Sequence, residues 1–145
     1  MYQRTILLAD PDPEIRSTLR RGLEMMGYGV MEVADGDSAL ALALRSELAL
    51  IVTELYVPTG DAICLVRAIR RMPALRRMKV LAYTAFVSMG DREWAFAAGA
   101  DAFLTKPTSL GQLLQVAGRL AQNRSHAGHR ALPRESVYTS SREAR

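Results

Sequence analysis

The sequence predicts an α/β protein with a parallel β-sheet covered by helices on both faces, and three observations lead to that prediction. Five short apolar runs of strand length alternate along the chain with five segments whose apolar residues recur at helical spacing. The connections between them are short, and Gly, Pro and Asp punctuate them. Because parallel strands need helical crossovers of one hand, this alternation favours a doubly wound sheet whose strands all end on the same edge.

The first third of the chain predicts two strands and two helices. Residues 5–9 (TILLA) form a continuous apolar run, typical of a strand buried on both faces. Asp12 before Pro13 starts a helix, because Asp can accept a hydrogen bond at the cap and Pro loses no donor in the first turn. Residues 30–34 predict the second strand, residues 35–36 a turn and residues 39–44 the second helix. The apolar positions of the first helix are Ile15, Leu19, Leu23 and Met26, and Gly27 ends it.

The remaining elements continue the alternation. Residues 48–53 predict the third strand, residues 80–84 the fourth and residues 102–105 the fifth. Asp61 is the expected cap of a third helix that carries Ile63, Val66 and Ile69 and stops near Pro73. The fourth helix spans residues 91–98 and ends at Gly99. Ser109 and Gln112 form a capping box for the last helix, whose sheet-facing residues are expected to be Leu113, Leu114, Ala117 and Leu120.

Composition and charge divide the chain into one domain, residues 4–122, and a flexible basic tail, residues 123–145. The whole chain carries a net charge of +4, and the tail contributes five Arg against two Glu with few apolar residues. The single Cys64 excludes an internal disulfide and is expected to be a buried thiol on a helical face. No segment approaches membrane-spanning length, so we expect a cytoplasmic globular protein. His126 and His129 fall in the tail, where we do not expect metal ligands.

Polar side chains follow the ends of four predicted strands. Asp10 follows the first strand, Glu54 the third and Lys106 the fifth, while Thr84 closes the fourth. Because parallel strands end on one edge, and ligands bind at that edge where strand order reverses, these side chains should converge. Two carboxylates can hold a hard cation, while a hydroxyl and an ammonium contact anionic oxygens. The sequence therefore predicts a site for a phosphoryl group or its mimic.

Four motifs in order resemble the receiver domain of two-component response regulators. They are ILLADPDPEIR (residues 6–16), IVTELYVPTGDA (51–62), LAYTA (81–85) and AGADAFLTKP (98–107). The resemblance covers about residues 4–122 and implies a flavodoxin-like (βα)5 sheet with strand order 2-1-3-4-5. In that family an aspartate after the third strand accepts a phosphoryl group from a histidine kinase. An acidic pair after the first strand binds Mg²⁺, and a Thr or Ser and a Lys bind the phosphoryl oxygens.

The resemblance assigns roles to five residues of this chain. The phosphoryl-binding hydroxyl and ammonium fall on Thr84 and Lys106, and Pro107 follows as in the family, where a cis bond usually precedes it. The switching aromatic falls on Phe103, and the first acid of the metal-binding pair falls on Asp10. Tyr56 and Phe86 occupy positions that flank the pocket mouth in receivers, where bulky rings would restrict access or simply pack.

Two positions depart from the family, and both act on the reaction. Pro11 replaces the second acid of the pair, which leaves Asp10 and Glu54 as weak Mg²⁺ ligands, so no cofactor is expected. Asp12 is expected to cap the helix instead. At the acceptor position, the extra methylene of Glu54 moves its carboxylate outward by roughly 1.5 Å, into the space of a phosphoryl group. Three interpretations follow: a pseudo-receiver fixed in an active-like state through Lys106 and Thr84, structural pairing alone, and residual phosphotransfer.

Outside the site, the sequence offers candidate surfaces for partners. Trp94 is either an outward anchor or folded over Met89 or Phe86. The second helix is apolar nearly all round, so exposure of Leu42 or Leu44 would create a second hydrophobic surface for contacts with a partner. A basic cluster, expected to be a solvated face at the rim opposite Glu54, comprises Arg67, Arg70, Arg71, Arg76, Arg77 and Lys79.

The sequence thus predicts a stand-alone, non-enzymatic signalling or adaptor module of a bacterial cytoplasm. It lacks a catalytic triad, a Gly-rich phosphate loop and a Cys/His cluster. We expect a homodimer or a protein partner, either a sensor histidine kinase or a downstream regulator, and no membrane or nucleic acid. Two alternatives stay open: a phosphotransfer-competent receiver, and a nucleic-acid-associated protein that uses the basic tail.

Overall fold

The computed structural model describes residues 4–60, 63–85, 88 and 90–122. One parallel sheet has the strand order β2-β1-β3-β4-β5, which confirms the predicted fold and topology. Its strands are β1 (Thr5–Ala9), β2 (Gly29–Val33), β3 (Leu50–Thr53), β4 (Val80–Thr84) and β5 (Ala102–Thr105). The helices are α1 (Pro13–Met25), α2 (Gly36–Arg45), α3 (Leu65–Arg71), α4 (Asp91–Ala98) and α5 (Leu110–Gln122).

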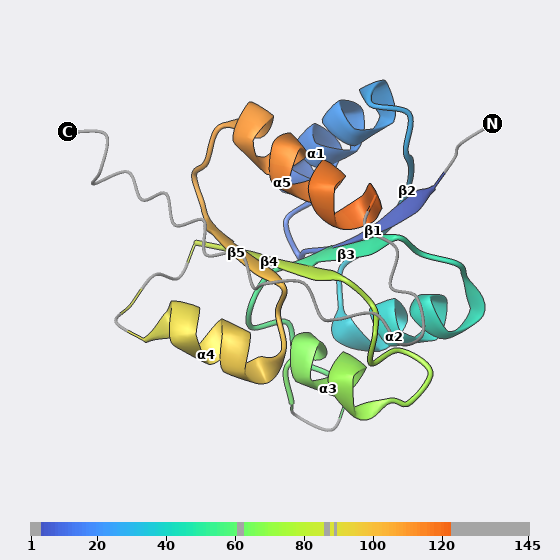
Figure 1. Ribbon diagram of the computed structural model, residues 1–145, viewed down its shortest axis with the longest axis vertical. Helices are drawn as coiled ribbons and strands as arrows, with labels where there is room; N and C mark the ends of the chain where they lie inside the picture. The colour runs from blue at the N-terminus through green and yellow to red at the C-terminus, as the bar shows by residue number, and fades with distance from the viewer. Residues whose placement is uncertain (1–3, 61–62, 86–87, 89, 123–145) are drawn as a thin grey trace.

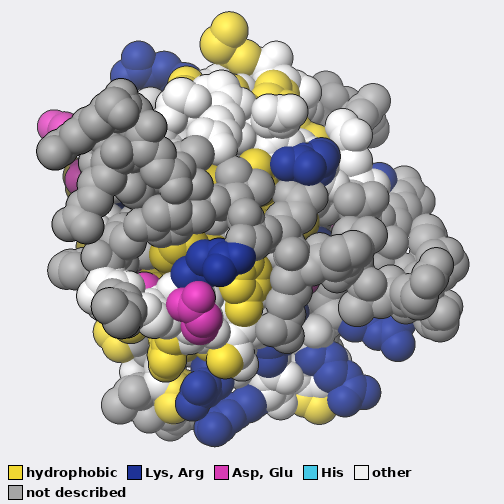
Figure 2. Space-filling model, turned by 60° about the vertical axis from the view of Figure 1, so that its left-hand side comes forward, with side chains coloured by type: hydrophobic (Ala, Val, Ile, Leu, Met, Phe, Trp, Pro, Cys, Tyr) yellow, Lys and Arg dark blue, Asp and Glu magenta, His cyan; other side chains and the backbone are white. Residues whose placement is uncertain are grey.

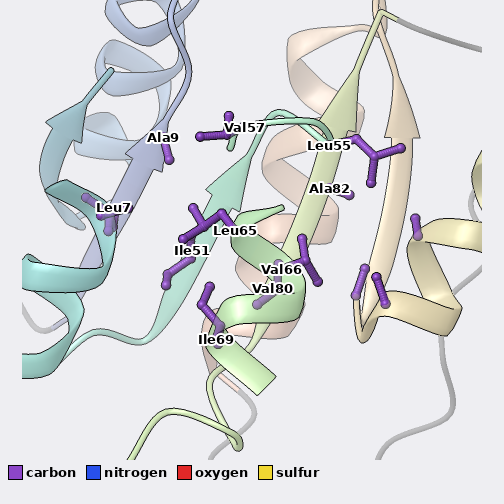
Figure 3. Packing of buried hydrophobic residues seen from close by; sticks show 14 of the residues in the cluster. Leu7, Ala9, Ile51, Leu55, Val57, Leu65, Val66, Ile69, Val80 and Ala82 are labelled. Carbon is purple, nitrogen blue, oxygen red and sulfur yellow. The ribbon is translucent and has the colours of Figure 1, made fainter. Parts of the chain in front are cut away.

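Helices cover both faces of the sheet, with α1 and α5 on one side and α2, α3 and α4 on the other (Figure 1). Successive side chains of a strand point to opposite faces, so each face has its own core. Figure 3 shows the core on the α2–α4 side, where Ile51 and Val80 of the sheet meet Leu65, Val66 and Ile69 of α3. The second core joins Leu8 and Leu104 of the sheet to α1 and α5. Burial on both faces explains the unbroken apolar runs of the strands.

Strand register brings the predicted site residues to one edge. Ala9 pairs with Thr53, so the residues that follow them, Asp10 and Glu54, leave adjacent strands at the same level. Thr84 pairs with Thr105, which directly precedes Lys106. The carboxyl edge of the sheet therefore gathers residues that lie up to 96 positions apart in the sequence.

Helix caps explain most of the observed boundaries. Asp12 accepts a hydrogen bond from the backbone N–H of Glu14 at 2.9 Å, as predicted. The side chain of Asp35 accepts the backbone N–H of Ser38 at 2.7 Å, so α2 begins at Gly36, three residues earlier than predicted. Ser109 Oγ accepts the backbone N–H of Gln112 at 3.1 Å at the start of α5.

Two expectations about helix faces were wrong. Helix α3 begins only at Leu65, because Cys64 forms an isolated bridge with Pro58 and the chain is still extended there. Ile63 therefore lies before the helix, and Cys64 is a partly buried thiol at its cap rather than on its face. Met26 follows the last turn of α1 and is exposed, because Gly27 at φ 95° turns the chain there.

Several predictions concern residues outside the described part of the chain. The cap at Asp61, the ring of Phe86, the contact with Met89 and the whole tail at 123–145 belong to this group. Among the residues that the structure describes, none of the helices is long and apolar enough to span a membrane.

Truncation of a buried leucine should destabilise the fold far more than truncation of an exposed one. Leu65→Ala removes a fully buried side chain of α3, so we expect the unfolding free energy to fall by about 2–5 kcal/mol. Leu44→Ala makes the same chemical change on α2, where the side chain is 50% exposed, and should cost less than about 1 kcal/mol. Urea denaturation measures both, and equal losses would contradict the core described here.

Candidate functional site

The ammonium group of Lys106 lies between two carboxylates at the carboxyl edge of the sheet. Its Nζ donates to Asp10 Oδ2 at 2.7 Å and to Glu54 Oε2 at 2.9 Å. The side chain of Lys106 is only 11% exposed, and those of Asp10 and Glu54 are similarly covered. The structure thus brings three of the four predicted pocket residues into direct contact, and the ion pairs join the ends of β1, β3 and β5.

The two carboxylate oxygens that do not contact Lys106 accept hydrogen bonds from backbone N–H groups. Asp10 Oδ1 accepts the N–H of Asp12 at 2.9 Å, and Glu54 Oε1 accepts the N–H of Leu55 at 2.8 Å. Each of the four carboxylate oxygens therefore has a protein donor. Both carboxylate oxygens of Glu54 are thus held, one by the ammonium of Lys106 just after β5 and the other by the loop that follows β3. Sequence analysis had not identified either backbone donor.

The environment of Lys106 keeps it charged. Burial alone would lower the pKa of this ammonium, but the hydrogen bonds to Asp10 and then Glu54, with the charges of both carboxylates, outweigh it and raise the pKa above the ordinary 10.5. Lys106 Nζ also lies 5.4 Å from the ring centre of Tyr83, a favourable cation–π distance. At neutral pH the site therefore contains one fixed cation that counters two acids.

The residues of this edge offer Mg²⁺ fewer free ligands than the family pattern does. Mg²⁺ requires near-octahedral oxygen coordination, usually with more than one free carboxylate. Here the ammonium of Lys106 occupies the position between Asp10 and Glu54, and Pro11 offers no side-chain ligand. Within the described ranges, no group of three or more His, Cys, Asp or Glu residues could hold a metal ion.

The other residues assigned from the resemblance lie near the same edge. Thr84 is completely buried at the end of β4, and its contact with Glu54 stays a prediction. Phe103 is completely buried in β5, on the face covered by α2–α4. The peptide bond between Lys106 and Pro107 is cis. The structure thus places an inward aromatic and a buried hydroxyl on neighbouring strands.

A hydrogen bond joins the loop after β3 to α4. The Tyr56 hydroxyl donates to Asp91 Oδ1, while Asp91 Oδ2 accepts from the backbone N–H and Oγ of Ser88. Asp91 is only 7% exposed, although Tyr56 is 42% exposed. The hydrogen bond to Asp91 is the main cause that raises the pKa of Tyr56, to about 12. The sequence indicated Asp91 only as the start of a helix, since nothing local connects it to a tyrosine 35 positions away.

Trp94 packs against Tyr56 and does not project alone from the surface of α4. Its ring centre is 5.3 Å from that of Tyr56, and the guanidinium carbon of Arg67 lies 5.8 Å from the Trp94 ring centre. Trp94 is partly buried against the core of the α2–α4 face, while Ala95 and Ala98 point fully inward, as predicted. Leu42 is likewise partly buried against that core, which leaves Leu44 as the exposed leucine of α2.

The predicted basic cluster is not uniformly solvated. Arg70 donates to the carbonyl oxygen of Gly99 at 2.8 Å and to Asp101 at 2.9 Å, so it ties α3 to the turn before β5. Arg67 contacts Trp94, as described above. Sequence reasoning missed both contacts because their partners lie about 30 residues away in the chain.

Comparison with known proteins places the chain in a family. Residues 6–117 match the response regulator receiver domain. The chain is 35% identical over 109 residues to the "DNA-binding dual master transcriptional regulator RpaA" of Synechocystis, a match that covers 75% of this chain and 45% of that protein. It spans about half the length of the curated transcriptional regulators it matches first.

Solved receiver structures match over nearly their full length. The receiver domain of the Francisella response regulator 1452 is 26% identical, with a TM-score of 0.74 over 83% of this chain and 98% of that one. The receiver domain of sensor histidine kinase PA1611 from Pseudomonas aeruginosa PAO1, which holds a magnesium ion in its active-site cleft, is 31% identical with a TM-score of 0.73 and the same coverage. These matches agree with the strand order described above.

The raised pKa of Lys106 can be measured directly, because the chain contains only two lysines, Lys79 and Lys106. We expect the ¹³Cε signal of Lys106 to titrate above pH 10.5 in the folded protein and to shift downward in Glu54→Gln, which removes one acceptor charge. Lys79→Arg assigns the two signals. Because the folded-state pKa is raised, the pairing stabilises the fold below about pH 10 and loses this effect as pH rises through that pKa. An unchanged titration in Glu54→Gln would contradict the pairing.

Removal of the Tyr56 hydroxyl should destabilise the protein in a pH-dependent way. Tyr56→Phe leaves Asp91 short of one donor, so the unfolding free energy should fall by about 1–2 kcal/mol at pH 7. Burial alone would raise the pKa of Asp91, but the hydrogen bonds from Tyr56 and Ser88 lower it overall, so the loss should vanish as pH falls through that pKa.

Tyr28→Phe is the matched control. Among the residues that the structure describes, its hydroxyl has one long hydrogen bond, from Gln122 Nε2 at 3.5 Å, and no carboxylate partner, so we expect a smaller and pH-independent effect between pH 3 and 7. Denaturant unfolding at several pH values distinguishes the two variants. Identical pH dependence in both would show that the Asp91 hydrogen bond does not stabilise the fold.

Proposed function

The chain belongs to the response regulator receiver family, and on that premise we propose that it acts as a signalling module that does not depend on phosphorylation. In this proposal Glu54 stands in the place of a phosphorylated aspartate, and its carboxylate takes the contacts that phosphoryl oxygens make in the family. The module is an atypical pseudo-receiver with no catalytic activity of its own. Its output is contact with another protein or a second copy of this chain.

The observation that carries the proposal is the 2.9 Å contact between Glu54 Oε2 and Lys106 Nζ. In the family the corresponding lysine binds a phosphoryl oxygen. In this chain a carboxylate oxygen of Glu54 takes that contact with Lys106. The second oxygen of Glu54 is held by the N–H of Leu55 at 2.8 Å. Because both of its oxygens are hydrogen-bonded, we expect the Glu54 carboxylate to keep these contacts and not to react with a phosphodonor.

Two further features support the loss of phosphotransfer. In-line attack on a phosphodonor depends on position at the level of tenths of an ångström, and Glu54 carries an additional methylene group. Mg²⁺ would have to bind carboxylates that already hold Lys106, and Pro11 supplies no side-chain ligand in the place of the family's second acid. Each change alone would weaken the reaction, and the two act together on the same step.

The buried position of Phe103 supports an active-like conformation. The inward arrangement of the switching aromatic is the one that the resemblance associates with the active state, and Phe103 is completely buried beneath α4 and α3. Phe103 and Thr84 lie on adjacent strands. The surroundings of the Phe103 ring therefore include the strand that ends beside Glu54. The proposed state is therefore fixed by the sequence and needs no modification.

The second candidate is a receiver that accepts a phosphoryl group at Glu54. Retention of Asp10, Thr84 and Lys106 at the family positions favours it. A relative named as a DNA-binding transcriptional regulator matches this chain over less than half of its own length.

Phosphorylation assays test the proposal directly. We expect no phosphoryl adduct on the protein after exposure to acetyl phosphate and Mg²⁺, as measured by intact mass. The double variant Pro11→Asp/Glu54→Asp rebuilds the family's acidic pair and acceptor, and we expect it to gain both the adduct and Mg²⁺ binding measured by calorimetry. The single variant Pro11→Asp is the control for metal binding alone. An adduct at Glu54 in the natural sequence would establish the second candidate instead.

A further inference from the structure

Three side chains from different elements form a stack on the α3–α4 side of the molecule. Tyr56 comes from the loop after β3, Trp94 from α4 and Arg67 from α3, and they are referred to below as the Arg–Trp–Tyr stack. The Trp94 ring contacts both partners: its centre lies 5.3 Å from that of the Tyr56 ring and 5.8 Å from the guanidinium carbon of Arg67. Arg67 and Tyr56 are exposed, whereas Trp94 is partly buried. The stack is therefore a surface feature with a buried base.

The stack is held in place before any partner arrives. Tyr56 is fixed through its hydroxyl to Asp91, which Ser88 holds in turn at the start of α4. The neighbouring Leu55 N–H is bonded to Glu54, so the loop that carries Tyr56 is restrained from the site as well. Aromatic and Arg side chains are the commonest anchors of protein interfaces, and pre-ordered ones lose little entropy on binding.

The helix that supplies Arg67 to the stack is rich in basic side chains, and Arg71 follows four residues later on the same side of α3. Residues 63–101, which include α3 and α4, carry seven basic side chains against three acidic ones. Two of those acids are engaged internally, Asp91 with Tyr56 and Asp101 with Arg70. Figure 2 turns forward the side that carries α4, and basic side chains lie there beside hydrophobic ones and gather along the lower edge. Within the described part of the chain, no ion pair involves the exposed residues Arg67, Arg71, Arg76 and Arg77.

From these observations we propose that the Arg–Trp–Tyr stack is a docking surface for an acidic segment of a partner protein. Carboxylates of that segment would pair with Arg67 and the neighbouring arginines of α3, while its apolar side chains would lie against Trp94 and Tyr56. The inference rests on the proposed protein-binding role and names the chemistry of the partner. It does not depend on whether Glu54 accepts a phosphoryl group.

The geometry favours a peptide over a nucleic acid. Sequence-tolerant binding of single strands relies on aromatic faces that are open for bases to stack on. Here Tyr56 and Arg67 already lie against the Trp94 ring. What the stack offers to solvent is the Arg67 guanidinium and the Tyr56 ring, which suit a carboxylate beside an apolar side chain.

Trp94 is the only tryptophan of the chain, so its fluorescence reports on this surface alone. The experiment titrates the full-length protein at low ionic strength with a twelve-residue peptide of alternating Glu and Leu. We expect a saturable change in Trp94 emission that weakens as salt is added, because exposed charges are screened. A Lys/Leu peptide of the same length is the control for hydrophobic contact. No change with the acidic peptide up to millimolar concentration, or an equal change with the basic one, would overturn the proposal.

Two charge reversals locate the site. Arg67→Glu should weaken binding of the Glu/Leu peptide by at least about tenfold, whereas Arg21→Glu makes the same charge change at an exposed position of α1 and should alter it less than threefold. Circular dichroism confirms that both variants are folded. Equal losses in the two variants would reduce the effect to net charge and overturn the assignment to the stack.

Two further measurements separate the competing explanations. A single-stranded oligonucleotide that changes Trp94 emission at lower concentration than the acidic peptide would replace the proposed partner with a nucleic acid. Peptide binding by Pro11→Asp/Glu54→Asp is expected to match that of the natural sequence without a phosphodonor. The docking surface and the phosphorylation-independent function can therefore fail separately.

Discussion

The carboxyl edge of this sheet depends on one ammonium group that two carboxylates share. Asp10, Glu54 and Lys106 directly follow three different strands, and their contacts span 52 and 96 positions of the sequence. Taking two acids away from water is unfavourable unless each is paired and hydrogen-bonded, and a single cation leaves one negative charge uncompensated. The N–H groups of Asp12 and Leu55 supply the remaining donors. Groups of the chain itself thus supply a donor to every carboxylate oxygen at this edge, although one negative charge is not neutralised.

That arrangement constrains what else the site can bind. Any cation that bound to the acids would compete with Lys106, and any anion that approached Lys106 would compete with Asp10 and Glu54. A receiver that responds to phosphorylation needs these groups to exchange partners. In this chain the extra methylene of Glu54 and the loss of a ligand at Pro11 both favour the arrangement without an external ion. The two departures from the family are therefore physically consistent with each other, since both act on the binding of an external ion at this edge.

The sequence was sufficient to predict the fold, because the alternation of apolar runs is a local property. Continuous runs such as residues 5–9 indicated strands buried on both faces, and the strand ends indicated which polar residues would meet. Local patterns failed where a non-local contact decides the outcome. The bridge between Pro58 and Cys64 delays α3 to Leu65, although the apolar spacing suggested an earlier start. The bond between Tyr56 and Asp91 is also invisible in sequence, since neither residue belongs to a motif that names the other.

The hydrogen bond between Tyr56 and Asp91 connects the loop after the site to the surface at α4. Coupling between the edge of the sheet and α4 requires a physical connection between them. Here a continuous series of hydrogen bonds runs from Lys106 through Glu54 to the N–H of Leu55, and the next residue, Tyr56, holds Asp91 at the start of α4. The series involves only groups that are present without phosphorylation. If Glu54 is a permanent substitute for the modified aspartate, α4 and Trp94 are held by the same restraint, and the surface they form is as constant as the site.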